Sequence, residues 1–301
     1  MIKYDSIFIK VDKTNTLHLM NIYSDCATQK NKNDKTPIFM LHGSMEDGRI
    51  FYTMNEKGLA PFLAKNGYDV YVLDKRGRGK STPPVSRKSK YSQKEVLFED
   101  IPAVLQEIKK QNKNKQIWMA HSWGGVLMNA YLARNPDYIP NITHCVYWGS
   151  KRRIATLNKE RFTQIYLMWG LTFRVTSRLY GYLPAKELKF GAENEPRKEY
   201  LQTIPWVSKK RWIDRYDRFN YGKALKKLTL PKTLYLSGKA DKILGNPKDV
   251  RLFMNESGNG IKLNVVLSTK NGNLHDYDHI NMLTHKDAPL DQFVKVYEWL
   301  N

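Results

Sequence analysis

The sequence has few cysteines and no long apolar run, and each absence excludes a class of protein. Its two cysteines, Cys26 and Cys145, stand far apart and form no metal-binding or redox motif. They predict free thiols in a reducing compartment. No apolar stretch approaches the roughly 20 residues that cross a bilayer, and the charged N-terminus lacks the core of a signal peptide. We therefore expect a cytoplasmic protein with no metal ion and no organic cofactor.

Signatures of nucleotide and nucleic-acid binding are also missing. The segment V-L-D-K-R-G-R-G-K-S-T contains G-K-S, but a phosphate-binding loop requires a glycine where Asp74 stands. A dinucleotide-binding motif requires a glycine at the position of Thr82. The chain is nevertheless basic, with a formal net charge of +21. Since no arginine-rich tract or zinc finger accompanies this charge, we expect a solvated lysine-rich surface and no nucleic-acid partner.

The positive charge is concentrated in residues 151–231, which contain 19 Lys and Arg residues but only 7 Asp and Glu residues. The stretch also contains 13 aromatic residues and interrupts a regular alternation of strand and helix patterns. We expect a mostly helical insertion, or cap, whose aromatic side chains line a ligand pocket or pack onto the host. A solvated lid is the favoured interpretation of its charge, and contact with an anionic membrane surface is the alternative. The sequence does not define the oligomeric state.

Outside this insertion, the apolar pattern predicts an α/β fold. Two alternating runs near the N-terminus flank a D-K-T-N-T turn and predict an antiparallel hairpin. Short apolar runs then predict strands buried on both faces of a parallel sheet, at 37–41, 69–73, 116–120, 145–148, 233–236 and 263–267. Helical patterns separate several of these runs, and S-Q-K-E at 92–95 is a capping box that opens one helix. We expect a core formed by residues 1–150 and 232–301, interrupted by the cap.

The stretch W-M-A-H-S-W-G-G places Ser122 between a predicted strand and a predicted helix. A serine nucleophile on such a sharp turn needs small residues two positions before and after it. Ala120 and Gly124 meet this requirement, although a small residue that eases a strand into a helix gives the same local sequence. The rest of the chain must therefore decide between a nucleophile and a spacer.

Acyl transfer also requires two backbone N–H groups that stabilise the developing oxyanion. The residue after the serine, Trp123, is expected to supply one of them. The loop H-G-S-M that follows the strand at 37–41 is expected to supply the other, from Ser44 or, as the fallback, from Met45. His42 in this loop is interpreted as a structural histidine that bonds to the loop backbone.

A serine nucleophile needs a general base and a carboxylate that orients the base. Asp241 lies in a turn directly after the predicted strand at 233–236 and is the best acid, while Asp276 and Asp278 are weaker candidates. His279 is the preferred base because an apolar helical pattern follows it, and His275 is the reserve.

Two further histidines lie near these candidates in the sequence. His121 borders the serine, and strand geometry is expected to point its side chain away from the nucleophile. His285 is expected to be exposed on the far side of the helical turn that follows the preferred base.

With these residues in place, the chain resembles the α/β-hydrolase fold superfamily, in its lid-bearing lipase, esterase and serine-aminopeptidase-like branch. The segments H-G-S-M, D-K-R-G-R-G-K-S, A-H-S-W-G-G, G-K-A-D-K-I and D-H-I-N-M-L-T-H-K-D-A-P occur in the order typical of that family, across residues 37–290. The resemblance implies a mostly parallel eight-stranded sheet flanked by helices, a helical cap at 151–231, and a catalytic triad of Ser122, Asp241 and His279.

The activity that the resemblance implies is cleavage of a carboxylic ester, acylglycerol-like or of another hydrophobic acyl group, through an acyl-serine intermediate. The substrate would be a small molecule, and no cofactor would be needed. An amidase or aminopeptidase, a thioesterase, and a non-catalytic ligand-binding member remain as alternatives, because the cap rather than the triad sets specificity in such a fold.

Overall fold

The computed structural model describes residues 1–24 and 35–301, so that Cys26 lies outside the described residues. Cys145 is free and buried. Within the described ranges, eight strands form one sheet: β1 (Ile2–Lys10), β2 (Thr16–Ser24), β3 (Pro37–Leu41), β4 (Asp69–Asp74), β5 (Gln116–His121), β6 (Ile142–Trp148), β9 (Lys232–Gly238) and β10 (Lys262–Leu267).

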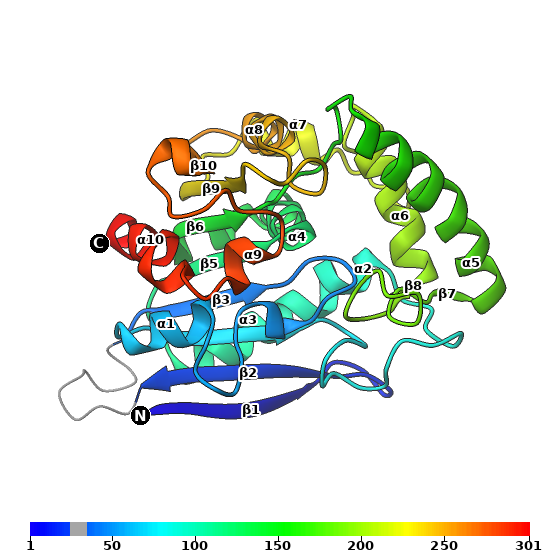
Figure 1. The fold of residues 1–301 in the computed structure, drawn as a ribbon. Coiled ribbons are helices and arrows are strands. Elements are labelled where there is room, and N and C mark those ends of the chain that lie inside the picture. Colours follow the sequence, from blue (N-terminus) through cyan, green and yellow to red (C-terminus); the bar gives the residue numbers. More distant parts are fainter. Residues whose placement is uncertain (25–34) are drawn as a thin grey trace.

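The order of strands across this sheet is β1-β2-β4-β3-β5-β6-β9-β10 (Figure 1). β2 runs antiparallel to both of its neighbours, and the strands from β4 to β10 are mutually parallel. The predicted fold class is confirmed. One detail differs, since β10 was expected to be buried on both faces but is mostly half-buried. The reason is its position at the edge of the sheet, where a strand has a neighbour on one side only.

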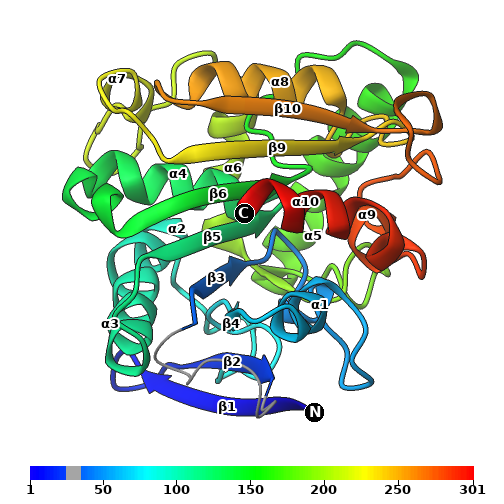
Figure 2. The same ribbon diagram turned by 90° about the vertical axis from the view of Figure 1, so that its left-hand side faces the viewer.

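Helices cover both faces of the sheet (Figure 2). The helical segments of the core are η2 (Gly48–Ile50), α1 (Leu59–Lys65), α2 (Gln93–Glu95), η3 (Val96–Asp100), α3 (Ile101–Gln111), α4 (Trp123–Arg134), η4 (Pro136–Asn141), α8 (Pro247–Glu256), η6 (Thr269–Asn271), α9 (Asn281–Thr284), η7 (Ala288–Leu290) and α10 (Gln292–Leu300). The capping box predicted at 92–95 is present at the start of α2. Among the described residues, no helix combines the length and apolar character that crossing a bilayer requires.

Alternate side chains of each central strand enter different halves of the core, as the period of a β-strand dictates. On β3, Phe39 and Leu41 pack with α3, α4 and α8, whereas Ile38 and Met40 pack with α1 and α10. The two layers of helices thereby bury both faces of the central strands. This burial holds the loops at the carboxyl ends of the strands on a rigid scaffold.

The segment expected to form the cap lies beyond these carboxyl ends (Figure 1). It contains the π-helix η5 (Arg161–Thr172), α5 (Phe173–Tyr180), β7 (Tyr182–Leu183), β8 (Glu195–Pro196), α6 (Arg197–Ser208) and α7 (Tyr221–Leu225). Phe173, Leu183, Ala185 and Tyr200 form a small core of their own, but Trp206, Trp212, Tyr221 and Leu225 belong to the main core. The boundaries 151–231 stay a prediction. Within them, one part of the segment has a core of its own and another part packs into the main core.

Candidate active site

Ser122 occupies a strained turn between β5 and α4. Its φ of 51° and ψ of −121° are far from the ordinary regions for a residue with a side chain. Gly124 makes the turn possible, because a Cβ at this position would collide with the carbonyl oxygen of Leu41. Ala120 is fully buried at the end of β5, and its methyl group fits there. The turn leaves the Ser122 side chain partly exposed.

A chain of hydrogen bonds joins the three residues that the sequence singles out. The Oγ of Ser122 lies 3.0 Å from Nε2 of His279, and Nδ1 of His279 lies 2.7 Å from Oδ2 of Asp241. The side chains of His279 and Asp241 are 10% and 3% exposed, so this contact is shielded from water. A neutral imidazole with its proton on Nδ1 would leave Nε2 free to accept the serine proton.

The electrostatics of Asp241 keep its carboxyl group ionised. Burial opposes ionisation, but the attraction of His279 and the hydrogen bond between the two residues outweigh it, so the pKa of Asp241 lies below its usual value. The other carboxylate oxygen, Oδ1, accepts a hydrogen bond from the backbone of Ile243 at 3.3 Å. The carboxylate is thus fixed in position as well as charged.

The alternative acids and the reserve base have other partners. Asp276 accepts hydrogen bonds from Thr269, and Asp278 accepts them from the backbone of Ile280. Nε2 of His275 lies 2.8 Å from Oδ2 of Asp287.

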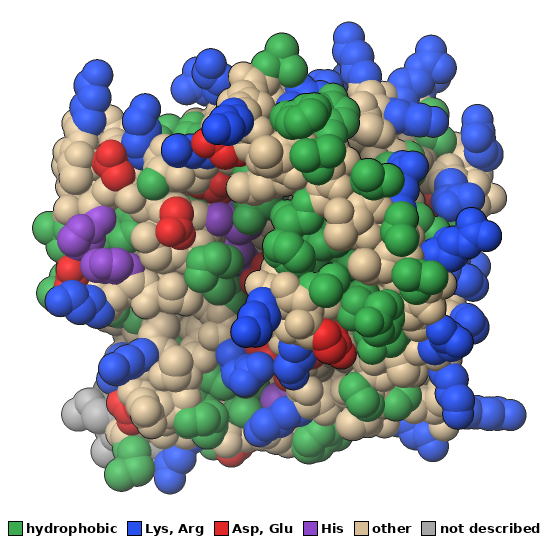
Figure 3. Space-filling model, turned by 45° about the vertical axis from the view of Figure 1, so that its right-hand side comes forward, with side chains coloured by type: hydrophobic (Ala, Val, Ile, Leu, Met, Phe, Trp, Pro, Cys, Tyr) green, Lys and Arg blue, Asp and Glu red, His purple; other side chains and the backbone are tan. Residues whose placement is uncertain are grey.

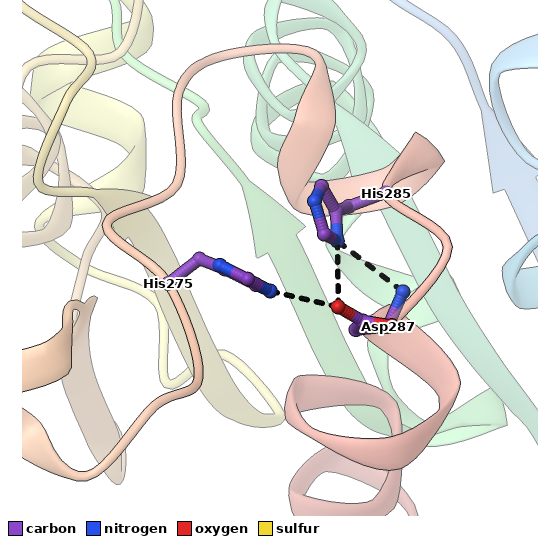
Figure 4. A group of neighbouring side chains, drawn as sticks. All are labelled: His275, His285 and Asp287. Atoms are coloured by element: carbon purple, nitrogen blue, oxygen red, sulfur yellow. Dashed lines mark hydrogen bonds and ion pairs between the residues drawn. The ribbon is translucent and has the colours of Figure 1, made fainter.

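His275 and Asp287 form a cluster with His285, whose side chain is 27% exposed (Figure 4). The ligand atoms of these three residues lie within 4.8 Å of one another, a spacing that one metal ion could bridge. The hydrogen bond between His275 and the Asp287 carboxylate, and the one that the backbone N–H of Asp287 donates to Nδ1 of His285, account for the arrangement without an ion.

Two residues that line the cavity beside Ser122, Ser44 and Trp123, remain the candidates for oxyanion donors. Trp123 is the first residue of α4, where a helix leaves its N–H group without an intrahelical acceptor. In the loop after β3, the N–H of Met45 already donates to Oε2 of Glu195 at 2.9 Å, which favours the amide of Ser44. Gly43 allows this loop to approach, since a Cβ there would come within 2.8 Å of the Cβ of Ser122.

The two histidines beside this site have different roles. His42 is a structural histidine, as expected: its Nδ1 bonds to the carbonyl oxygen of Gly43, and its Nε2 accepts from the backbone N–H of Lys75. His121 was expected to point away from the nucleophile, and its ring lies beside that of the predicted base, His279. Its ring centre lies 4.7 Å from that of His279.

His121 joins two parts of the site that the sequence did not connect. Its Nε2 lies 2.9 Å from the backbone oxygen of His279, and its Nδ1 lies 2.8 Å from a carboxylate oxygen of Glu46. Burial works against a charged imidazole, but attraction to Glu46 outweighs it and raises the pKa of His121. Glu46 and His121 therefore position the loop that carries His279, a role that the sequence analysis assigned to neither of them.

A buried charge cluster attaches the cap segment to the core. Arg78, in the loop after β4, contacts Glu195 at 3.0 Å and Glu199 at 2.7 Å, and Lys75 contacts Glu199 at 3.3 Å. All four side chains are at most 2% exposed. Although burial opposes its ionisation, the two cations lower the pKa of Glu199 to about 2. Since Glu195 also accepts from the amide of Met45, the cluster reaches the loop that carries Ser44.

A cavity of about 780 Å³ opens directly onto Ser122 and His279. Its volume falls in the range of small-molecule sites, which is roughly 300 to 1,000 Å³. Ser44 and Trp123 also line it, and most of the remaining wall is apolar. The segment at 151–231 supplies Ile154, Ile165, Trp169, Phe190 and Val207 to this wall.

The fold and the arrangement of these residues define an α/β-hydrolase. A family model described as the alpha/beta hydrolase fold matches residues 36–257, and the chain belongs to this family. A search of curated proteins found no match.

Solved structures of similar fold include 2-hydroxy-6-oxo-6-phenylhexa-2,4-dienoate hydrolase from Rhodococcus sp. strain RHA1. It is 16% identical with a TM-score of 0.61, and 99% of this chain and 100% of that one are covered. Naproxen esterase from Bacillus subtilis is 12% identical with a TM-score of 0.55 and coverage of 100% and 92%. A monoacylglycerol lipase from Paleococcus ferrophilus is 17% identical with a TM-score of 0.54 and coverage of 88% and 95%. At these identities the similarity shows the fold.

Proposed function

We propose that this protein is a serine hydrolase that cleaves carboxylic esters of hydrophobic acyl groups. The observation that carries the proposal is the hydrogen-bonded chain Ser122–His279–Asp241, whose serine and histidine line a mainly apolar cavity. A protein that only binds a ligand has no need of a strained serine next to a histidine and a buried carboxylate. The esterase and lipase among the structures of similar fold are consistent with this reaction class.

The proposed reaction has two halves. In the first, Oγ of Ser122 attacks the ester carbonyl carbon while Nε2 of His279 takes the serine proton, and the amides of Ser44 and Trp123 stabilise the oxyanion. The alcohol then leaves with the proton from His279, and an acyl-serine remains. In the second half, His279 takes a proton from water as the water oxygen attacks the acyl carbon. The bond between the acyl carbon and Oγ of Ser122 then breaks, His279 returns the proton to Oγ, and the carboxylic acid is released. Asp241 orients the imidazole and stabilises its charged form throughout.

Covalent labelling combined with a substrate panel tests this proposal. A fluorophosphonate probe should add its mass to the peptide that contains Ser122, and a hydrolysable long-chain ester should slow the labelling. The panel would compare acyl esters of increasing chain length with monoacylglycerols, aminoacyl amides and thioesters. Turnover confined to amides or to thioesters would replace the ester assignment with the corresponding alternative. If the folded protein neither reacts with the probe nor hydrolyses any substrate of the panel, the alternative of a non-catalytic ligand-binding protein would be favoured.

We also propose that the outer helix of the cap docks on anionic lipid surfaces. Phe162, Tyr166, Leu171, Val175 and Leu179 follow one another at intervals of four or five residues along η5 and α5. Each of these side chains is between 51% and 63% exposed. Such a stripe is typical of helices that lie in a membrane interface.

Charge complementarity favours an anionic surface over a neutral one. Lys and Arg side chains surround the hydrophobic side chains on the face shown in Figure 3. Basic residues near an anionic bilayer contribute roughly 1 kcal/mol each. The protein should therefore sediment with vesicles that contain phosphatidylglycerol, and less at high salt. Leu171→Ser combined with Leu179→Ser should reduce binding, and binding that does not depend on the anionic lipid content would contradict the proposal.

A further inference from the structure

The charged side chains that line the cavity differ in whether they have a partner. Glu46 pairs with His121, and Asp47 pairs with Arg49 at 2.6 Å. Lys151, which follows the end of β6, and Lys189 also line the cavity, and neither side chain makes a hydrogen bond or ion pair among the described residues. Lys189 is exposed, so water can solvate its charge, whereas Lys151 is not. A cation without a partner in an apolar cavity is costly, because little water remains to solvate it.

The position of Lys151 places it on the side of the cavity where the reacting groups lie. It stands two residues after Gly149, where a Cβ would come within 2.9 Å of the His279 ring. Lys151 is half-buried. Burial lowers the pKa of its ammonium group to about 8, although the carboxylates of Asp249 and Asp241 oppose this shift.

Neither of these carboxylates is an ion-pair partner for Lys151. Asp241 is engaged by His279, and Oδ1 of Asp249 accepts the backbone N–H groups of Ala155 and Thr156. Oδ2 of Asp249 is buried and has no hydrogen-bond partner among the described residues. A purely structural role for Lys151, as a counter-charge to Asp249, is therefore the competing explanation.

We propose that Lys151 forms an anion subsite, so that the preferred substrate is a carboxylic ester that also bears a carboxylate. This inference rests on the proposed function and specifies its substrate class. The substrate carboxylate would supply the charge-assisted hydrogen bonds that the ammonium group lacks. The apolar walls would strengthen this pairing, because the attraction between charges grows as the surrounding dielectric falls. The remainder of the acyl or alcohol group would occupy the apolar part of the cavity.

Two pairs of isosteric esters test the subsite and locate the anion. The acyl-side pair is para-nitrophenyl hydrogen glutarate and the matching ester in which an isopropyl group replaces the carboxylate. The alcohol-side pair is para-carboxyphenyl acetate and para-isopropylphenyl acetate. The wild-type protein should favour the anionic ester in one of the two pairs, and that pair shows whether the anion belongs to the acyl or to the alcohol side.

Lys151→Met should lower kcat/KM for that anionic ester by about tenfold or more, which corresponds to the loss of about 1.4 kcal/mol. The neutral ester should change by less than about threefold, as expected when an interaction with the substrate charge is lost.

Two control variants separate a local contact from a general charge effect. Lys151→Arg keeps the cation and should retain the preference. Lys209→Met removes an exposed cation at the end of α6, away from the cavity, and should leave the preference unchanged. In the wild-type protein the preference should fall as the pH rises through about 8, because Lys151 then loses its proton. With Lys151→Arg this fall should be absent.

Binding without turnover separates failure of the subsite from failure of the proposed reaction. In a Ser122→Ala background, calorimetry should show tighter binding of the anionic ester, and Lys151→Met should remove this difference. If Lys151→Met weakens activity or binding equally for both esters of a pair and also lowers the melting temperature, Lys151 has the structural role beside Asp249, and the subsite is overturned. An unchanged preference in Lys151→Met would overturn it as well. If no ester is hydrolysed but the anionic one still binds through Lys151, the proposed reaction fails and the subsite stands.

Discussion

Replacing Ser122 with alanine is expected to lower kcat for ester hydrolysis by roughly a millionfold, the loss seen when a serine hydrolase loses its nucleophile. The methyl group of alanine cannot form the acyl intermediate, and the residual rate would come from the oxyanion donors and from binding alone. Steady-state kinetics on the best ester of the panel measures the loss, and the fluorophosphonate adduct should disappear in parallel. The KM should change little, since the cavity walls stay in place.

Ser150 offers a matched control for this variant. Its side chain is fully buried, and its hydroxyl has no hydrogen-bond partner among the described residues. Ser150→Ala should leave kcat within a few fold of the wild-type value. A Ser122→Ala protein that keeps more than about a hundredth of the wild-type rate would refute the nucleophile, because removal of a true nucleophile costs far more.

Asp241→Asn is expected to lower kcat by about ten-thousandfold while the protein stays folded. An asparagine amide can donate to Nδ1 of His279, which would place the imidazole proton on Nε2, where it faces Ser122. The base would then be unable to accept the serine proton. Steady-state kinetics at neutral pH measures the loss, and circular dichroism checks the fold.

The rejected acid candidate provides the comparison for this variant. Asp276→Asn alters a carboxylate in the loop that carries His279, and this carboxylate bonds to Thr269 rather than to the base. Its effect on kcat should be within a few fold, and any destabilisation should appear in the melting temperature instead. An equal loss of kcat in the two variants would contradict the assignment of Asp241.

The sequence was sufficient to predict the scaffold and to select three residues that the structure brings within hydrogen-bonding distance. Short apolar runs mark the strands of the parallel sheet, and their bounds agree with the structure to within a few residues, although the edge strand β10 is not buried on both faces. Ser122, Asp241 and His279 could be selected because a known fold fixes their order along the chain. The hydrogen bonds that join them could only be seen in three dimensions.

The positions of Glu46 and His121 were missed, although part of the signal is present in the sequence. Met119 on β5 packs on the same side of the sheet as Leu283 and α10, and His121 follows it by two residues on that side. The loop of His279 leads into Leu283, so the two histidines approach each other. Glu46 could not have been predicted, because its position depends on how the loop after β3 folds back over the site.

The charge cluster beneath the cap restricts how this protein can exchange parts with its relatives. Lys75 and Arg78 lie in the loop after β4, whereas Glu195 and Glu199 lie in β8 and α6, within the segment predicted to form the cap. A recombinant that received a different cap without these carboxylates would retain two buried cations with no counter-charge. Leaving buried charges unpaired typically costs about 3 to 5 kcal/mol, a large part of the stability of a folded domain. A recombinant that exchanges the cap must therefore also exchange the loop after β4 if it is to fold.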